Sequence, residues 1–133
     1  MIGNYKIITL CGSTRFKEDF LRVQKDLTLK GNIVISVGLF GHSGDDEVWT
    51  EGTKEMLDDM HKRKIDMADA IYVINKDGYI GASTKSEIEY AYNHGKDVFF
   101  MEPCAEEVKQ MIDLFYANKH AYEKISQKEK ERV

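Results

Sequence analysis

Four short apolar runs alternate along this chain with segments of helical periodicity, and this alternation is what most constrains its fold. The apolar runs lie at residues 6–11, 33–40, 70–74 and 98–101. Helices are expected between and after them, at about residues 15–29, 53–67, 84–93 and 103–116. Nearly continuous apolar strands separated by helices predict a parallel sheet that is covered on both faces. We therefore expect an open, doubly wound α/β sheet of flavodoxin-like or Rossmann-like type, with four to five strands.

The length of 133 residues is enough for one domain with a single core. We place this α/β domain at residues 1–117, and a charged C-terminal helix or tail at residues 118–133. The apolar residues of the tail are too few to bury a face of their own. The tail is therefore expected to be frayed or docked on another subunit.

Charge and composition narrow the classes of partner. The net charge of −4 and the pI near 5.6 leave no broad basic surface, so a nucleic-acid polymer or an anionic membrane is a poor partner. The chain carries no apolar run of membrane-spanning length and no secretory leader, which predicts a cytoplasmic protein. Its two cysteines, Cys11 and Cys104, lack the spacing of a zinc site. No metal and no cofactor are expected.

In a sheet of this kind, ligands bind at the carboxyl ends of the strands, where the strand order reverses. The first strand ends there in the turn Gly12-Ser13-Thr14-Arg15. Free backbone N–H groups, hydroxyls and a guanidinium at the start of a helix predict a phosphate site. The turn lacks the lysine of a Walker A loop and the three glycines of a dinucleotide fingerprint. A plain tight turn, with Ser13 or Thr14 as the N-cap of the helix, is the alternative.

Two further segments converge on the same edge. After the third strand, residues 77–87 place Ser83, Thr84 and Glu87 at a helix start. The alternative here is a capping box, in which Glu87 only satisfies a backbone donor. The loop at residues 38–52 carries Phe40, His42 and Trp49, whose rings are suited to stack on a flat heterocycle or to pack under the loop.

Three motifs resemble the nucleoside 2-deoxyribosyltransferase superfamily. They are Leu10-Cys11-Gly12-Ser13-Thr14-Arg15, Met67-Ala68-Asp69-Ala70-Ile71 and Ser86-Glu87-Ile88-Glu89-Tyr90-Ala91, in this order. The first motif is most similar to that of the 2′-deoxynucleoside 5′-phosphate N-hydrolase branch. The resemblance extends to Glu102 and implies a small-molecule nucleotide or nucleoside as substrate. It also implies a homodimer or a higher homo-oligomer.

The resemblance assigns roles to individual residues. Glu87 takes the place of the glutamate that attacks the anomeric carbon. The residues expected to bind the 5′ end of the nucleotide are Gly12, Ser13, Arg15, Ser83 and Thr84. The chain departs from the family at His61, where an aspartate is usual, and at Lys85 and Ser86, where glycines are common. Either His61 takes over the role of that aspartate, or Asp58 or Asp59 does, or the base is recognised in a different way.

The chemistry of the residues supports two classes of function. A carboxylate stabilises or traps the oxocarbenium-like state of N-glycosidic cleavage, and free N–H groups at its helix start favour its ionised form. A neighbouring acid must protonate the departing base, and His61 and Asp66 are the candidates, although Asp66 alone is more typical of a solvated helix residue. Asp69 is typical of a structural cap. Hydrolysis of a deoxynucleotide, transfer of deoxyribose between bases, and a non-catalytic nucleotide or nucleotide-sugar sensor remain open.

Overall fold

A computed structural model describes residues 1–41 and 50–103 of the chain. Its centre is a parallel four-stranded sheet with the strand order β2-β1-β3-β4. The strands are β1 (Ile7–Gly12), β2 (Ile33–Ile35), β3 (Ala70–Ile74) and β4 (Asp97–Phe100). Strands β1 and β3 lie in the middle, and β1 pairs along its length with β3, from Ile8 opposite Ala70 to Gly12 opposite Ile74.

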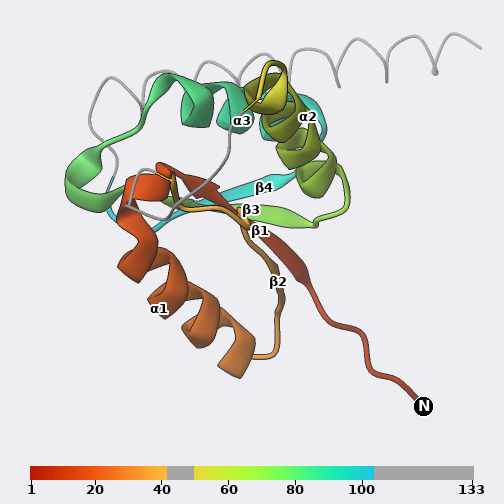
Figure 1. Cartoon of the computed structure of the whole chain (residues 1–133). Helices are drawn as coiled ribbons and strands as arrows, with labels where there is room; N and C mark the ends of the chain where they lie inside the picture. The colour runs from red at the N-terminus through yellow and green to blue at the C-terminus, as the bar shows by residue number, and fades with distance from the viewer. Residues whose placement is uncertain (42–49, 104–133) are drawn as a thin grey trace, which may run out of the picture. The chain divides into compact units, whose positions relative to one another are not determined.

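Helices cover both faces of this sheet (Figure 1). Helix α1 (Lys17–Leu29) follows the short 3-10 helix η1 (Thr14–Phe16) and lies on one face, whereas α2 (Thr53–Asp66) and α3 (Ala82–Asn93) lie on the other. A second 3-10 helix, η3 (Lys76–Gly78), joins β3 to the loop before α3. The expected doubly wound, flavodoxin-like α/β architecture is confirmed. Within the described ranges, no helix is long and apolar enough to span a bilayer.

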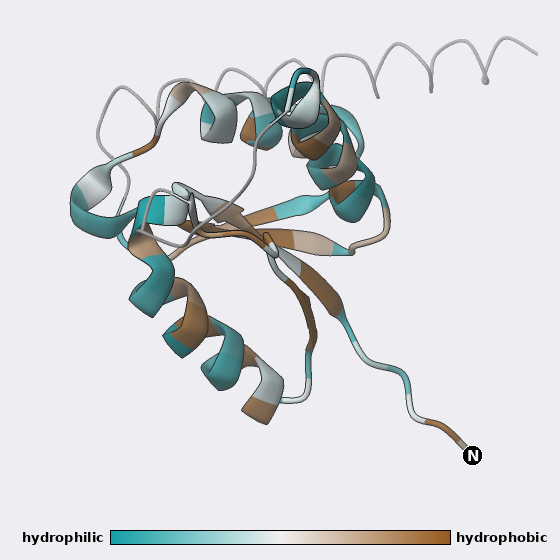
Figure 2. Ribbon diagram, viewed as in Figure 1, coloured by the Kyte–Doolittle hydropathy of each residue, from teal (hydrophilic) through white to brown (hydrophobic). Residues whose placement is uncertain are grey.

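The core follows from the alternation of side chains along the two central strands. Leu10 of β1 and Ile74 of β3 pack with Phe20 and Val23 of α1. The side chains next to Leu10 point to the opposite face, where the Thr9 hydroxyl donates a hydrogen bond to the Lys64 carbonyl of α2 at 2.9 Å. Figure 2 shows this pattern as apolar strands between helices whose outer surfaces are hydrophilic. Both faces of β1 are therefore buried, as expected for the centre of a parallel sheet.

The second strand is shorter than the sequence predicts. The expected strand at residues 33–40 ends at Ile35, because the following backbone leaves the sheet. Gly38 has a φ of +84°, which an extended strand does not accommodate, and Lys64 Nζ binds the carbonyls of Ser36 and Val37 at 2.9 and 3.3 Å. The apolar residues beyond Ile35 thus belong to a loop, where they line the pocket or pack against the core. The expected helix at 103–116 and the tail at 118–133 lie outside the described residues.

Candidate active site

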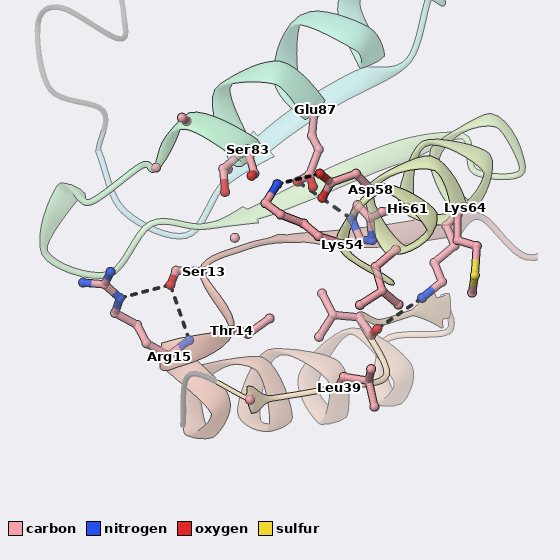
Figure 3. A pocket seen from close by; sticks show the side chains of 18 of the residues that line it. Ser13, Thr14, Arg15, Leu39, Lys54, Asp58, His61, Lys64, Ser83 and Glu87 are labelled. Atoms are coloured by element: carbon pink, nitrogen blue, oxygen red, sulfur yellow. Dashed lines mark hydrogen bonds and ion pairs between the residues drawn. The ribbon is translucent and has the colours of Figure 1, made fainter. Parts of the chain in front are cut away.

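A pocket of about 390 Å³ lies at the carboxyl edge of the sheet, where the sequence predicts a ligand site (Figure 3). Its floor is the end of β1, and its walls come from the loop after β2, helix α2 and the start of α3. The predicted residues Gly12, Ser13, Thr14, Arg15, His61, Ser83, Thr84 and Glu87 all line it. The fold therefore brings together residues that are up to 75 positions apart in the sequence.

The turn after β1 requires glycine at its first position. Gly12 has a φ of +147°, and a Cβ atom there would lie 2.7 Å from the carbonyl oxygen of Ile74. Ser13 caps η1, because its Oγ accepts a hydrogen bond from the Arg15 backbone N–H at 3.4 Å. The capping alternative for Ser13 is therefore correct, but the same hydroxyl also faces the pocket. One residue thus shapes the turn and remains available to a ligand.

Arg15 is held in place by its neighbours rather than left free in solvent. Its Nε donates to Ser13 Oγ at 3.1 Å and a terminal nitrogen donates to the Tyr79 hydroxyl at 3.2 Å. The guanidinium also stacks over the Tyr79 ring, 4.4 Å from its centroid. A guanidinium held this way at a pocket rim is suited to bind an anionic group.

Three side chains from three elements meet in the interior of the pocket. Cys11 of β1 and His61 of α2 are buried, and their Sγ and Nε2 atoms are 3.4 Å apart. The Glu87 carboxylate of α3 lies 3.9 Å from the same Nε2 atom. The ligand atoms of all three lie within 4.8 Å of one another, so the fold creates a possible metal-ligand set that sequence spacing did not indicate. We call these three residues the Cys-His-Glu cluster.

The environment of Glu87 separates its two interpretations. The structure starts α3 at Ala82 with Gly81 as the N-cap and no side-chain cap hydrogen bond, so a capping box at Thr84 and Glu87 is wrong. Glu87 instead sits in the second turn, and only 14% of its side chain is exposed. Burial raises its pKa to about 7, against a smaller lowering by a hydrogen bond from Cys11. The expectation that the helix start favours the ionised form is therefore wrong, because burial dominates.

The His61 imidazole is neutral at pH 7. Burial, and secondarily the charge of Lys64, lowers its pKa to about 4, against a hydrogen bond to the Leu10 backbone that acts in the opposite direction. The contact with Glu87 is therefore not an ion pair at neutral pH. A neutral imidazole is a poor source of the proton that a departing base needs.

Helix α2 contributes a row of pocket residues, of which sequence reasoning singled out His61 and Asp58 but neither lysine as a site residue. Lys54 Nζ binds Asp58 Oδ2 at 2.8 Å, and Lys64 anchors the loop after β2. With His61, these residues share one face of α2 and line the pocket. The recurrence of charged and polar residues at helical spacing was a signal that could have identified this face.

The remaining candidate residues have structural roles or lie outside the described residues. Phe40 packs on core residue Phe20, with the ring centroids 5.6 Å apart, which favours the packing interpretation over substrate stacking. Asp66 accepts a hydrogen bond from the Tyr90 hydroxyl at 2.7 Å, and Asp69 accepts the Ile7 N–H at 2.8 Å. Both carboxylates thus serve the fold. His42 and Trp49 fall outside the described residues.

Comparison with solved structures gives a likeness in fold. The fold matches a solved structure of a 2-deoxyribosyltransferase from the psychrotolerant bacterium Bacillus psychrosaccharolyticus, a biocatalyst for nucleoside synthesis. The TM-score is 0.61 at 20% sequence identity, and the match covers 80% of this chain and 79% of the other. No model of a protein family matches the sequence, and neither does any curated protein. The likeness shows a shared fold over most of both chains.

Proposed function

We propose that this chain is a member of the nucleoside 2-deoxyribosyltransferase superfamily that cleaves the N-glycosidic bond of a 2′-deoxynucleoside or its 5′-phosphate. The observation that carries the proposal is the position of Glu87. It is a buried carboxyl group without a capping function, in the same pocket as the Arg15 guanidinium. A binding protein for anions gains nothing from a buried carboxylate beside its ligand, whereas a glycosidic reaction uses one.

The proposed reaction has two steps at Glu87. A carboxylate oxygen forms a bond to the anomeric carbon while the bond from that carbon to the base nitrogen breaks, and the base leaves with the electron pair. The base then takes up a proton from water, and an acceptor attacks the anomeric carbon, gives up its own proton to water and releases Glu87 as the carboxylate. The neutral imidazole of His61 lies beside the carboxylate, with Nε2 3.9 Å from it, and forms part of the pocket wall there. The nucleophile must be ionised, which a pKa near 7 allows for about half of the molecules at neutral pH.

The acceptor distinguishes transfer from hydrolysis. The shared fold with a 2-deoxyribosyltransferase favours a second base as the acceptor. Water as the acceptor would make the protein an N-hydrolase, which the resemblance of the Cys11-Gly12-Ser13 turn supports. The Arg15 contacts with Ser13 and Tyr79 favour a 5′-phosphate on the substrate in either case.

A panel of deoxynucleosides and their 5′-phosphates, each with and without a second free base, tests this function by chromatography of the products. We expect base release in both arms for a hydrolase, and a new nucleoside only with the second base for a transferase. Glu87→Gln should lower the rate by several powers of ten, while Glu89→Gln, on the exposed side of the same helix, leaves it unchanged. Mass spectrometry of the quenched enzyme should find a deoxyribosyl adduct on the peptide containing Glu87.

The competing function, a nucleotide sensor, predicts a different result in the same experiment. A sensor binds deoxynucleotides and releases no base from any of them. Equal base release by the wild type and Glu87→Gln would remove Glu87 as the nucleophile.

A further inference from the structure

We propose that the Cys-His-Glu cluster binds one Zn²⁺ ion, and that this ion inhibits the enzyme by occupying Glu87. The inhibitory part rests on the proposed function, whereas the binding part does not. The site is built from Cys11, His61 and Glu87, which come from β1, α2 and α3 and share no sequence motif.

The chemistry of the three side chains selects the metal. A thiolate, an imidazole and a carboxylate are ligands that Zn²⁺ uses, and the sulfur disfavours Mg²⁺ and Ca²⁺, which prefer oxygen. Three protein ligands leave a fourth tetrahedral position, which a water molecule from the pocket can fill. The thiol proton is released to the buffer when the Zn–S bond forms. With two anionic ligands and a neutral imidazole, the bound Zn²⁺ complex has no net charge, which reduces the cost of its burial.

The distances fit an ion without a large rearrangement. In tetrahedral zinc sites with bonds of about 2.0–2.3 Å, neighbouring ligand atoms lie roughly 3.3–3.6 Å apart. Here, Cys11 Sγ and His61 Nε2 are 3.4 Å apart, and Nε2 and the Glu87 carboxylate are 3.9 Å apart. Glu87 is the member nearest to solvent, with 14% of its side chain exposed, and its flexible side chain can close the remaining gap.

The cluster also has the support that metal ligands need. Cys11 lies on the central strand β1, where it pairs with Val73 of β3. The His61 imidazole hydrogen-bonds the Leu10 backbone, while its Nε2 faces Cys11 and Glu87. A backbone partner on one ring nitrogen fixes the orientation of the other toward a metal. Glu87 is thus the only one of the three ligands that must move.

Cobalt(II) titration of the chelator-treated full chain tests the site directly, because a thiolate bound to Co²⁺ gives a strong near-ultraviolet charge-transfer band. We expect one Co²⁺ per chain, displaced by Zn²⁺. Cys11→Ser should lose the band, whereas Cys104→Ser, which changes the second cysteine, should keep it. Glu87→Gln should keep the band and weaken Co²⁺ binding about 100-fold, since even outer-shell partners of a metal are worth about 10- to 100-fold. Circular dichroism confirms that each variant is folded.

A band that persists in Cys11→Ser, or the absence of stoichiometric binding in the wild type, would overturn the site. Should Cys11→Ser not fold, equal Co²⁺ affinity of Glu87→Gln and the wild type would overturn it instead. In activity assays, Zn²⁺ should stop base release, a chelator should restore it, and Cys11→Ser should need about 100-fold more Zn²⁺ for the same inhibition. Unchanged activity in wild-type protein shown to be metal-loaded would refute the inhibition. A protein that binds Co²⁺ but, after chelator treatment, releases no base from any substrate would refute the proposed function and the inhibition that rests on it, and would leave the metal site standing.

Discussion

Replacing Glu87 with glutamine should make the protein more stable while it abolishes activity. The side chain is largely buried, and burial raises its pKa from 4.5 to about 7. Above pH 7 the folded protein therefore holds a charge that its surroundings disfavour. Glutamine has the same shape and no charge, so Glu87→Gln removes this cost.

The magnitude follows from the change in pKa. A shift from 4.5 to about 7 corresponds to roughly 3 kcal/mol of unfolding free energy at pH 8. The wild-type protein loses stability as the pH rises. Glu87 ionises from pH 4.5 upward in the unfolded state, but only near pH 7 in the folded state. At pH 5 the difference should shrink to less than about 1 kcal/mol, and at lower pH it should vanish.

Urea unfolding followed by circular dichroism, at pH 8 and at pH 5 with a metal chelator present, measures this difference. Glu89→Gln on the exposed face of α3 is the matched control and should change stability by less than about 0.5 kcal/mol at either pH. A Glu87→Gln variant that is less stable than the wild type at pH 8, or that gains equally at both pH values, would refute the account of a buried, disfavoured charge.

Three further predictions concern the anion site, the turn and the assembly. Arg15→Ala should weaken the binding of deoxynucleoside 5′-phosphates at least about tenfold, as measured by calorimetry, because it removes a contact worth roughly 1.5–3 kcal/mol. Arg22→Ala is the control. An equal loss of affinity for unphosphorylated nucleosides would exclude a contact between Arg15 and the phosphate. Gly12→Ala should cost at least about 2 kcal/mol in urea unfolding, because its Cβ would meet a backbone carbonyl at 2.7 Å. Gly31→Ala, with a φ of +91° and open space, should cost only about 1 kcal/mol, and equal costs would argue against the clash. Residues 118–133 hold too few apolar residues to bury a face of their own, and we expect them to dock on a second subunit. Light scattering at micromolar concentration should therefore give at least the mass of a homodimer, and a fully active monomer would contradict this.

The sequence predicted most of the fold because burial leaves a direct pattern in the central strands. The apolar residues of β1 and β3 need no knowledge of their partners to be recognised. The same pattern predicted too long a strand at β2. Val37, Leu39 and Phe40 are apolar because they line the pocket or pack in the core, and none of them belongs to a strand. The start of α3 was placed two residues late, since Thr84 looks like a cap but is buried within the helix.

The site was predictable to the extent that it lies in local turns. Gly12, Ser13 and Arg15 follow a strand directly, so the topology alone placed them at the ligand edge. The surroundings of Cys11 were not predictable, because they depend on how α2 and α3 pack over β1. The raised pKa of Glu87 has the same origin, since it reflects burial and not sequence position.

The parallel order of the strands has a consequence for how this protein reaches its working state. Strands that pair in the sheet are separated along the chain by at least one helix, and Cys11 and His61, which touch through Sγ and Nε2, are 50 positions apart. Such contacts are closed only after long loops have lost their conformational entropy, which makes folding slow for the size of the domain. The Cys-His-Glu cluster should consequently form among the last contacts, and nascent chains or proteolytic fragments that lack α3 should be inert. Under the proposed function, a chain in which α3 has not yet packed lacks the Glu87 nucleophile and should release no base.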